Sequence, residues 1–91
     1  MSDSAELPSV TFSSFITTLA SSAMVSLGMA PDPASQAKSV NLDLARYSID
    51  CLAVLEGKTS GNLDAEEKQL LESLLFELRS KFVEVSKAQR G

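Results

Sequence analysis

Apolar residues in the first third of the chain recur with the period of an α-helix. Over residues 12–27 they are spaced alternately three and one residues apart, which places them along one side of a helix. Thr11 or Ser9 can cap its N-terminus, because a hydroxyl oxygen there accepts a hydrogen bond from a free backbone N–H group. Gly28 can end the helix in the left-handed conformation of a Schellman motif. The pattern therefore predicts a first helix over residues 12–27.

Two further periodic segments follow, separated by a short turn. Asn41 can cap the second helix, and Gly57 marks its expected end. Asp64, with Glu67 three residues later, is typical of a capping box at the start of a third helix, which should extend to about Lys87. The apolar stripe of the second helix consists of Leu44, Ala45, Ser48, Ile49, Cys51, Leu52, Ala53 and Leu55. That of the third helix consists of Leu71, Leu74, Leu75, Leu78, Phe82 and Val85.

These elements predict an all-α fold in a single domain. The chain has 91 residues, which is enough for one domain, and its Leu, Ala, Ser and Glu residues favour helix over strand. We expect a three-helix protomer in which helices two and three form a hairpin and the N-terminal helix packs beside them. Residues 9–88 should form the domain, with flexible ends at residues 1–8 and 89–91. Pro31 and Pro33 make residues 28–40 an extended connector.

Composition and charge argue against several kinds of function. The net charge is −4 and the eight Lys and Arg residues are scattered, so we expect no nucleic-acid partner and no binding to anionic membranes. The chain has no His and a single Cys, Cys51, which argues against a disulfide and against a Cys/His metal site. We therefore expect no metal and no cofactor. The lone Cys and the lack of a cationic N-terminal segment favour a cytoplasmic protein.

Much of the sequence is similar to a known family. The segments "FSSFITTLASSAMVSLG", "PDP" and "NLDLARYSIDCLAVLEGKTSGNLDAEEKQLLESLLFELRSKFVE" together resemble small bacterial proteins that contain domain of unknown function 1844. The most specific stretch of this resemblance lies between Asn41 and Asn62. It implies a bacterial, cytoplasmic, all-helical protein, and it implies no activity or catalytic residues.

Three groups of polar residues could carry chemistry. Asp43, Arg46 and Asp50 share one face of the second helix, where Arg46 could bind an anion between two carboxylates. A solvated ladder of ion pairs explains the same spacing, and we favour it. The segment "GKTSG" at residues 57–61 resembles the end of a phosphate-binding loop but lacks the first glycine of that motif, so we interpret it as a turn. Cys51 has no His to activate it and should be a buried core residue, so we predict no catalytic residues and no enzyme.

The first helix carries a face of small hydroxyl residues, and no charged residue occurs between Leu7 and Pro31. Small residues four apart let the backbone of another helix approach closely, and their hydroxyls can bond to carbonyls of the preceding turn. We therefore expect this face to contact a second copy of the chain. A second, smaller apolar strip lies on helix three. The predicted oligomer interface consists of Ser14, Thr18, Ser22, Ser26, Phe76 and Val83.

The sequence thus favours a non-catalytic interaction or scaffold module that forms a homodimer or a higher homo-oligomer, with an unidentified protein partner as well. A peripheral membrane protein that uses the uncharged first helix is one alternative, although such helices usually carry Lys or Arg on their polar face. That helix is about 24 Å long, short of the roughly 30 Å of a bilayer core, so we do not expect it to span a membrane. A further alternative is an accessory subunit that lends a carboxylate or Arg46 to an enzyme site completed by a partner.

Overall fold

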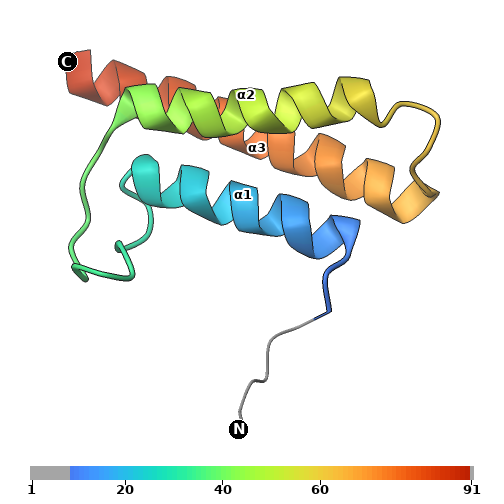
Figure 1. Cartoon of the computed structure of the whole chain (residues 1–91). Helices are drawn as coiled ribbons and strands as arrows, with labels where there is room; N and C mark the ends of the chain where they lie inside the picture. Colours follow the sequence, from blue (N-terminus) through green and yellow to red (C-terminus); the bar gives the residue numbers. More distant parts are fainter. Residues whose placement is uncertain (1–8, 91) are drawn as a thin grey trace, which may run out of the picture.

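The computed structural model describes residues 9–90 and has an all-α fold, as the sequence predicts. The predicted tail, residues 1–8, and residue 91 lie outside the described residues. Three helices follow one another along the described part of the chain (Figure 1): α1 (Phe12–Ser26), α2 (Leu42–Lys58) and α3 (Ala65–Arg90).

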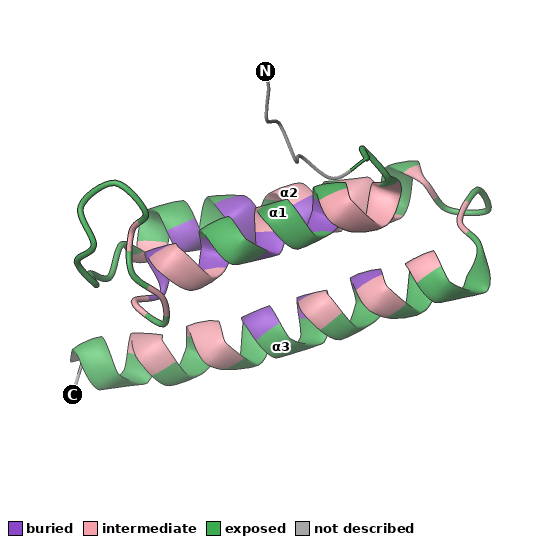
Figure 2. Ribbon diagram, turned by 90° about the horizontal axis from the view of Figure 1, so that it is seen from below, coloured by how far each residue is buried: buried purple, intermediate pink, exposed green. Residues whose placement is uncertain are grey.

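Consecutive helices run in opposite directions and meet around one core. α2 and α3 overlap in Figure 1, α1 and α2 overlap in Figure 2, and each helix contacts both others, so the three form a triangular bundle. Buried residues lie on the sides of the helices that face one another (Figure 2). The large side chains that are almost completely buried are Ile16, Leu27, Leu52, Leu71 and Leu75. The core is completed by Ala20, Ala23, Ala45, Ile49 and Leu78.

Each helix begins at a capping residue that the sequence predicts. Thr11 caps α1, Asn41 caps α2 and Asp64 precedes α3. The Asn41 side-chain oxygen accepts a hydrogen bond from the Leu44 N–H at 3.0 Å. At α3 the Glu67 N–H donates to the Asp64 carboxylate at 2.8 Å, and the Asp64 N–H donates to the Glu67 carboxylate at 3.0 Å. This reciprocal pair is the predicted capping box.

The end of α1 is a Schellman motif built on Gly28. Gly28 has a φ of 76°, its N–H donates to the Val25 carbonyl, and the Met29 N–H donates to the Met24 carbonyl, both at 3.0 Å. A Cβ atom at residue 28 would lie 2.9 Å from Cγ2 of Val40, because the connector passes close to the end of the helix. Gly28 is therefore required for its backbone conformation and also for the space that it leaves.

The connector between α1 and α2 folds back onto the end of α1. Leu27 and Val40 form an isolated β-bridge, and the Asn41 N–H donates to the Ser26 carbonyl at 2.7 Å. Farther out, the Asp32 carboxylate accepts a backbone N–H hydrogen bond at 2.7 Å and closes a turn. These contacts fix where α2 starts relative to the end of α1.

α2 ends later than the sequence predicts. Gly57 lies inside the helix, and Thr59 is the C-terminal cap. The N–H and the hydroxyl of Thr59 both donate to the Leu55 carbonyl, at 2.9 and 2.6 Å. The expectation that Gly57 stops the helix was therefore wrong, because Thr59 satisfies the last turn and the left-handed glycine is Gly61, with a φ of 87°. Residues 57–61 are the end of a helix and its turn, as interpreted from the sequence.

α3 also extends farther than the sequence predicts. It continues to Arg90, whereas its expected end was near Lys87, so residues 89–90 of the predicted flexible end continue the helix. Ala88, Gln89 and Arg90 all have high helix propensity, and no glycine or proline interrupts them.

Two glycines provide a matched test of this fold. Gly28→Ala should lower the free energy of unfolding by about 1–3 kcal/mol, because alanine is strained at positive φ and its Cβ would collide with Val40. Gly57→Ala should raise it by about 0.5–1 kcal/mol, since Gly57 lies in a helix with open space around it. Urea unfolding followed by circular dichroism measures both changes. Equal effects of the two substitutions would contradict the described end of α1.

Candidate functional site

An apolar depression lies along the seam between α1 and α2. Its volume is about 430 Å³, and nearly all of its lining is apolar. Asp50, at its edge, is the one charged residue in this lining. We call this surface the α1–α2 face, and it consists of Phe15, Leu19, Tyr47, Cys51, Val54 and Leu55.

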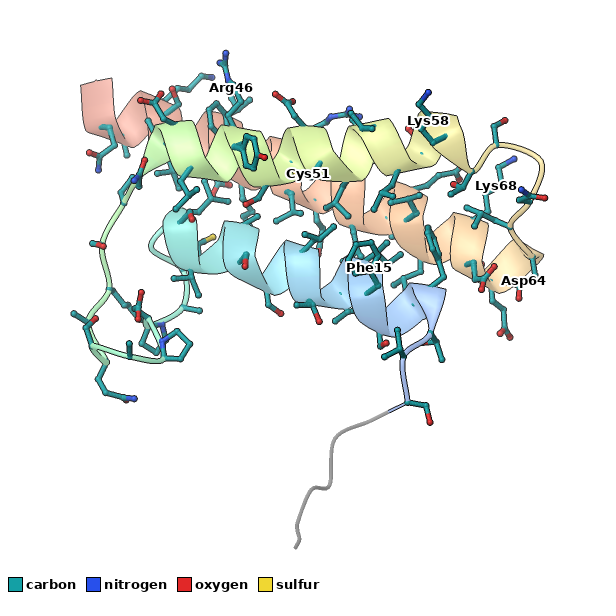
Figure 3. The ribbon with its side chains drawn as sticks, in the orientation of Figure 1. Phe15, Arg46, Cys51, Lys58, Asp64 and Lys68 are labelled. Carbon is teal, nitrogen blue, oxygen red and sulfur yellow. The ribbon has the colours of Figure 1, made fainter. Side chains whose placement is uncertain are left out.

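Both aromatic side chains of the α1–α2 face, and that of Val54, are exposed to water. Tyr47 is 68% exposed, Val54 is 59% exposed and Phe15 is 46% exposed. The helices meet through small buried residues such as Ala23 and Ala45, which leave no space for an aromatic ring in the seam. The large side chains therefore lie along the outside of the seam. Figure 3 labels Phe15 on α1 and Cys51 on α2, which line this depression from its two sides.

The sequence analysis did not include Tyr47 and Val54 among the candidate site residues. The signal that could have found them is a second apolar stripe on α2, in which Leu44, Tyr47, Cys51 and Val54 are spaced by three, four and three residues. Leu44 was assigned to the core but is 50% exposed. Helical positions at this spacing share one side, so the stripe lies along the outer side of α2.

Cys51 is only partly buried, so the expectation that it is a buried core residue was wrong. Its neighbour Leu52 takes the core position instead and is completely buried. Successive residues of a helix are rotated by about 100° about its axis. Because Leu52 faces the core, Cys51 lies at the margin of the α1–α2 face. Cys51 is a free thiol in the structure.

Two residues of the predicted hydroxyl face have local structural roles. The Ser14 hydroxyl oxygen accepts a hydrogen bond from the Thr11 N–H at 2.9 Å, and the Ser14 N–H donates to the Thr11 hydroxyl at 2.9 Å. This capping box starts α1. Ser26 is buried where the connector crosses the end of α1. Ser14 and Ser26 thus help to define the protomer.

Thr18 and Ser22 are the members of the hydroxyl face that stay exposed. The Thr18 hydroxyl donates to the Ser14 carbonyl at 2.9 Å, as expected for a hydroxyl on a helix. Thr18 and Ser22 follow Phe15 by three and seven residues, so they lie beside it and extend the α1–α2 face along α1. Their contact with a second copy remains a prediction.

A second exposed strip lies between α2 and α3. Phe76 is 73% exposed and Val83 is 52% exposed, so both side chains of the predicted second strip are at the surface. They line a depression of about 390 Å³ together with Glu56, Glu72 and Arg79. This surface, which we call the α2–α3 face, is therefore rich in charge, whereas the α1–α2 face is not.

The predicted polar cluster is exposed on α2, and Arg46 contacts α3. The Arg46 guanidinium lies 5.5 Å from the centroid of the Phe82 ring, within the range of a cation–π interaction. Asp43 and Asp50 are exposed. Asp50 lines both the α1–α2 depression and a smaller one beside Arg46, so it lies between the two depressions. The structure thus gives Arg46 a packing role, in which it joins α2 to α3.

Within residues 9–90 no three or more Cys, Asp or Glu side chains lie together in a way that could hold a metal ion. None of the helices described there combines the length and apolar character needed to cross a bilayer.

The sequence over residues 9–84 matches the family described as "Domain of unknown function (DUF1844)". The chain belongs to this family. The match covers all of α1 and α2 and most of α3, so the family corresponds to the three-helix unit. Comparisons with curated proteins and with solved structures found no match.

The contact between Arg46 and Phe82 can be measured as a coupling energy. Arg46→Ala should lower the free energy of unfolding by about 0.5–1 kcal/mol, the usual size of an exposed cation–π interaction. Asp43→Asn should change it by less than about 0.5 kcal/mol, as expected for an exposed carboxylate. In a double-mutant cycle, Arg46→Ala should cost less in a Phe82→Leu background. Additive effects would show that the guanidinium and the ring do not interact.

Proposed function

We propose that this protein is a non-catalytic helical interaction module that self-associates through the α1–α2 face, in a bacterial cytoplasm. The observation that carries the proposal is the gathering of Phe15, Tyr47 and Val54 on one nearly uncharged surface, where each of the three side chains is between 46% and 68% exposed. Contiguous apolar patches of this kind mark sites of interaction in soluble proteins.

The size of the exposed patch supports association. An aromatic side chain carries about 150–250 Å² of surface, so the exposed parts of Phe15, Tyr47, Val54 and Leu44 amount to roughly 400 Å². Adjoining parts of Leu19, Thr18 and Ser22 bring the patch toward the roughly 800 Å² that each partner contributes to a standard interface. The four exposed side chains thus supply about half of the area that one partner contributes to a standard interface.

The small core of the protomer favours a second copy as the partner. In the described residues seven Leu and Ile side chains are buried, whereas nine large hydrophobic side chains are exposed there. Domains of this length gain only a few kcal/mol from their own core and often add stability by association. A copy of the same chain is present wherever the protein is made, and it offers the same apolar face.

The charge distribution argues for protein rather than lipid on this face. Helices that lie on membranes usually carry Lys and Arg beside the apolar residues, where they meet anionic lipid headgroups. α1 carries no charged residue, and the charged group that lines the apolar depression is the acidic Asp50. Vesicles that contain anionic lipid should therefore not bind the protein in a flotation assay. Flotation with such vesicles would favour the membrane alternative.

Two valines with similar exposure test which face associates. Val54 lies on the α1–α2 face and is 59% exposed, and Val83 lies on the α2–α3 face and is 52% exposed. Val54→Asp should weaken self-association roughly tenfold or more, because each copy would bury an unpaired carboxylate. Val83→Asp should leave it nearly unchanged. Sedimentation velocity at tens of micromolar measures the mass of each variant against the protomer mass of 9.7 kDa.

The same two variants can also contradict the proposal. If Val83→Asp dissociates the protein and Val54→Asp does not, the α2–α3 face is the interface. If the unchanged protein sediments as a monomer, self-association fails. Circular dichroism of both variants provides the control, since both substitutions are at exposed helical positions and should preserve the helix content.

A further inference from the structure

We infer that the second copy docks with its α2 antiparallel to α2 of the first copy, about a two-fold axis at the level of Cys51. This inference rests on the proposed self-association and adds the orientation and register of the two copies. Its main observation is the apolar stripe on α2 formed by the exposed residues Leu44, Tyr47 and Val54 and the partly buried Cys51.

The spacing of this stripe fits a helix that packs against another helix. Successive members are three, four and three residues apart, which is the a and d spacing of paired helices. The core-facing side of α2 is a different set of residues, among them Ala45, Ile49 and Leu52. α2 therefore has one side that packs within the protomer and an opposite side with the pattern of a helix interface.

Charges at the two ends of the stripe select the antiparallel orientation. Asp43 lies in the first turn of α2 and Lys58 in its last turn. If the axis passes at Cys51, Asp43 of one copy lies within one residue, about 1.5 Å, of the level of Lys58 in the other copy. This brings opposite charges together at both ends. In a parallel pair Asp43 would instead lie level with Asp43 of the other copy, and Lys58 with Lys58 of the other copy, so like charges would repel.

The rest of the protomer is compatible with this axis. The β-bridge pairs Leu27, just after α1, with Val40, just before α2, and the two helices run antiparallel. Counting the same number of residues away from the bridge along each helix therefore places Cys51 on α2 at the same level as Ile16 on α1. Phe15 is adjacent to that level, so its exposed ring lies near the axis. Because α1 carries no charge, the two copies bring no like charges together there.

Asp50 is the residue that this arrangement places unfavourably. It precedes Cys51 and lies between the α1–α2 depression and the smaller one beside Arg46, so the two symmetry-related carboxylates would lie across the axis from each other, on the same face of the helix pair. Asp50→Asn should therefore lower the dissociation constant of the dimer, roughly two- to fivefold, the effect of removing one weak charge repulsion. Asp43→Asn should raise it by a similar factor, because it removes the attraction to Lys58.

Disulfide cross-linking tests the register, because Cys51 is the single cysteine of the chain. With copper phenanthroline as the oxidant, two thiols lose two protons and two electrons and form one S–S bond between the copies. Cys51 should cross-link rapidly. A cysteine moved to residue 44 in a Cys51→Ser/Leu44→Cys variant should cross-link at least about tenfold more slowly, because the two copies of residue 44 are roughly 21 Å apart along the axis of α2. Cys51 in a Val54→Asp chain controls for random collisions.

Each outcome separates this inference from the proposed function. Rapid cross-linking at Cys51 and slow cross-linking at residue 44 support the antiparallel register. Equal cross-linking rates at both positions mean a parallel pair. No cross-linking at Cys51 in a protein that sediments as a dimer means that the two copies meet through another contact. Either result overturns the inference and leaves self-association intact. A monomeric unchanged protein overturns both.

Discussion

The close packing of α1 on α2 through small side chains is the contact on which the rest of the structure depends. Ala20, Ala23 and Ala45 are buried, as are the hydroxyl residues Ser26 and Ser48. Small residues allow two helices to approach closely, and a close seam leaves no room for an aromatic ring between them. Phe15, Tyr47 and Val54 therefore lie along its outer margin. The exposed apolar surface is thus a consequence of how the core is built.

The connector makes this packing specific. Gly28 turns the chain at the end of α1, and the bridge between Leu27 and Val40 returns it to the start of α2. The hydrogen bond from the Asn41 N–H to the Ser26 carbonyl joins the two helix ends directly. Because one end of the helix pair is fixed, each residue of α1 lies at a fixed level relative to the residues of α2. The same contact therefore positions the two sides of the α1–α2 face.

The fold was largely predictable because its signals are local. Thr11, Asn41 and Asp64 cap their helices as the sequence predicts, since a cap depends only on the next three residues. Gly57 misled the prediction because glycine is tolerated within a helix when another residue ends it, and here the Thr59 side chain supplies that end.

The candidate site was harder to predict, because it depends on contacts between helices. The hydroxyl face was correctly placed on α1, but its spacing could not show that Ser14 belongs to a capping box or that Ser26 is covered by the connector. Tyr47 and Val54 were missed because one helix can carry two apolar stripes, and the sequence does not say which one the protomer buries. Cys51 was assigned to the core for the same reason.

The most direct test of the account is an isotope-filtered NMR measurement on a sample that mixes labelled and unlabelled chains. Tyr47 and Val54 are seven residues apart on α2, about 10.5 Å along the helix, so their side chains are not in contact within one chain. The account predicts intermolecular contacts between the Tyr47 ring and the Val54 methyl groups of the other copy. Intermolecular contacts confined to Phe76 and Val83, or no intermolecular contacts at all, would contradict it.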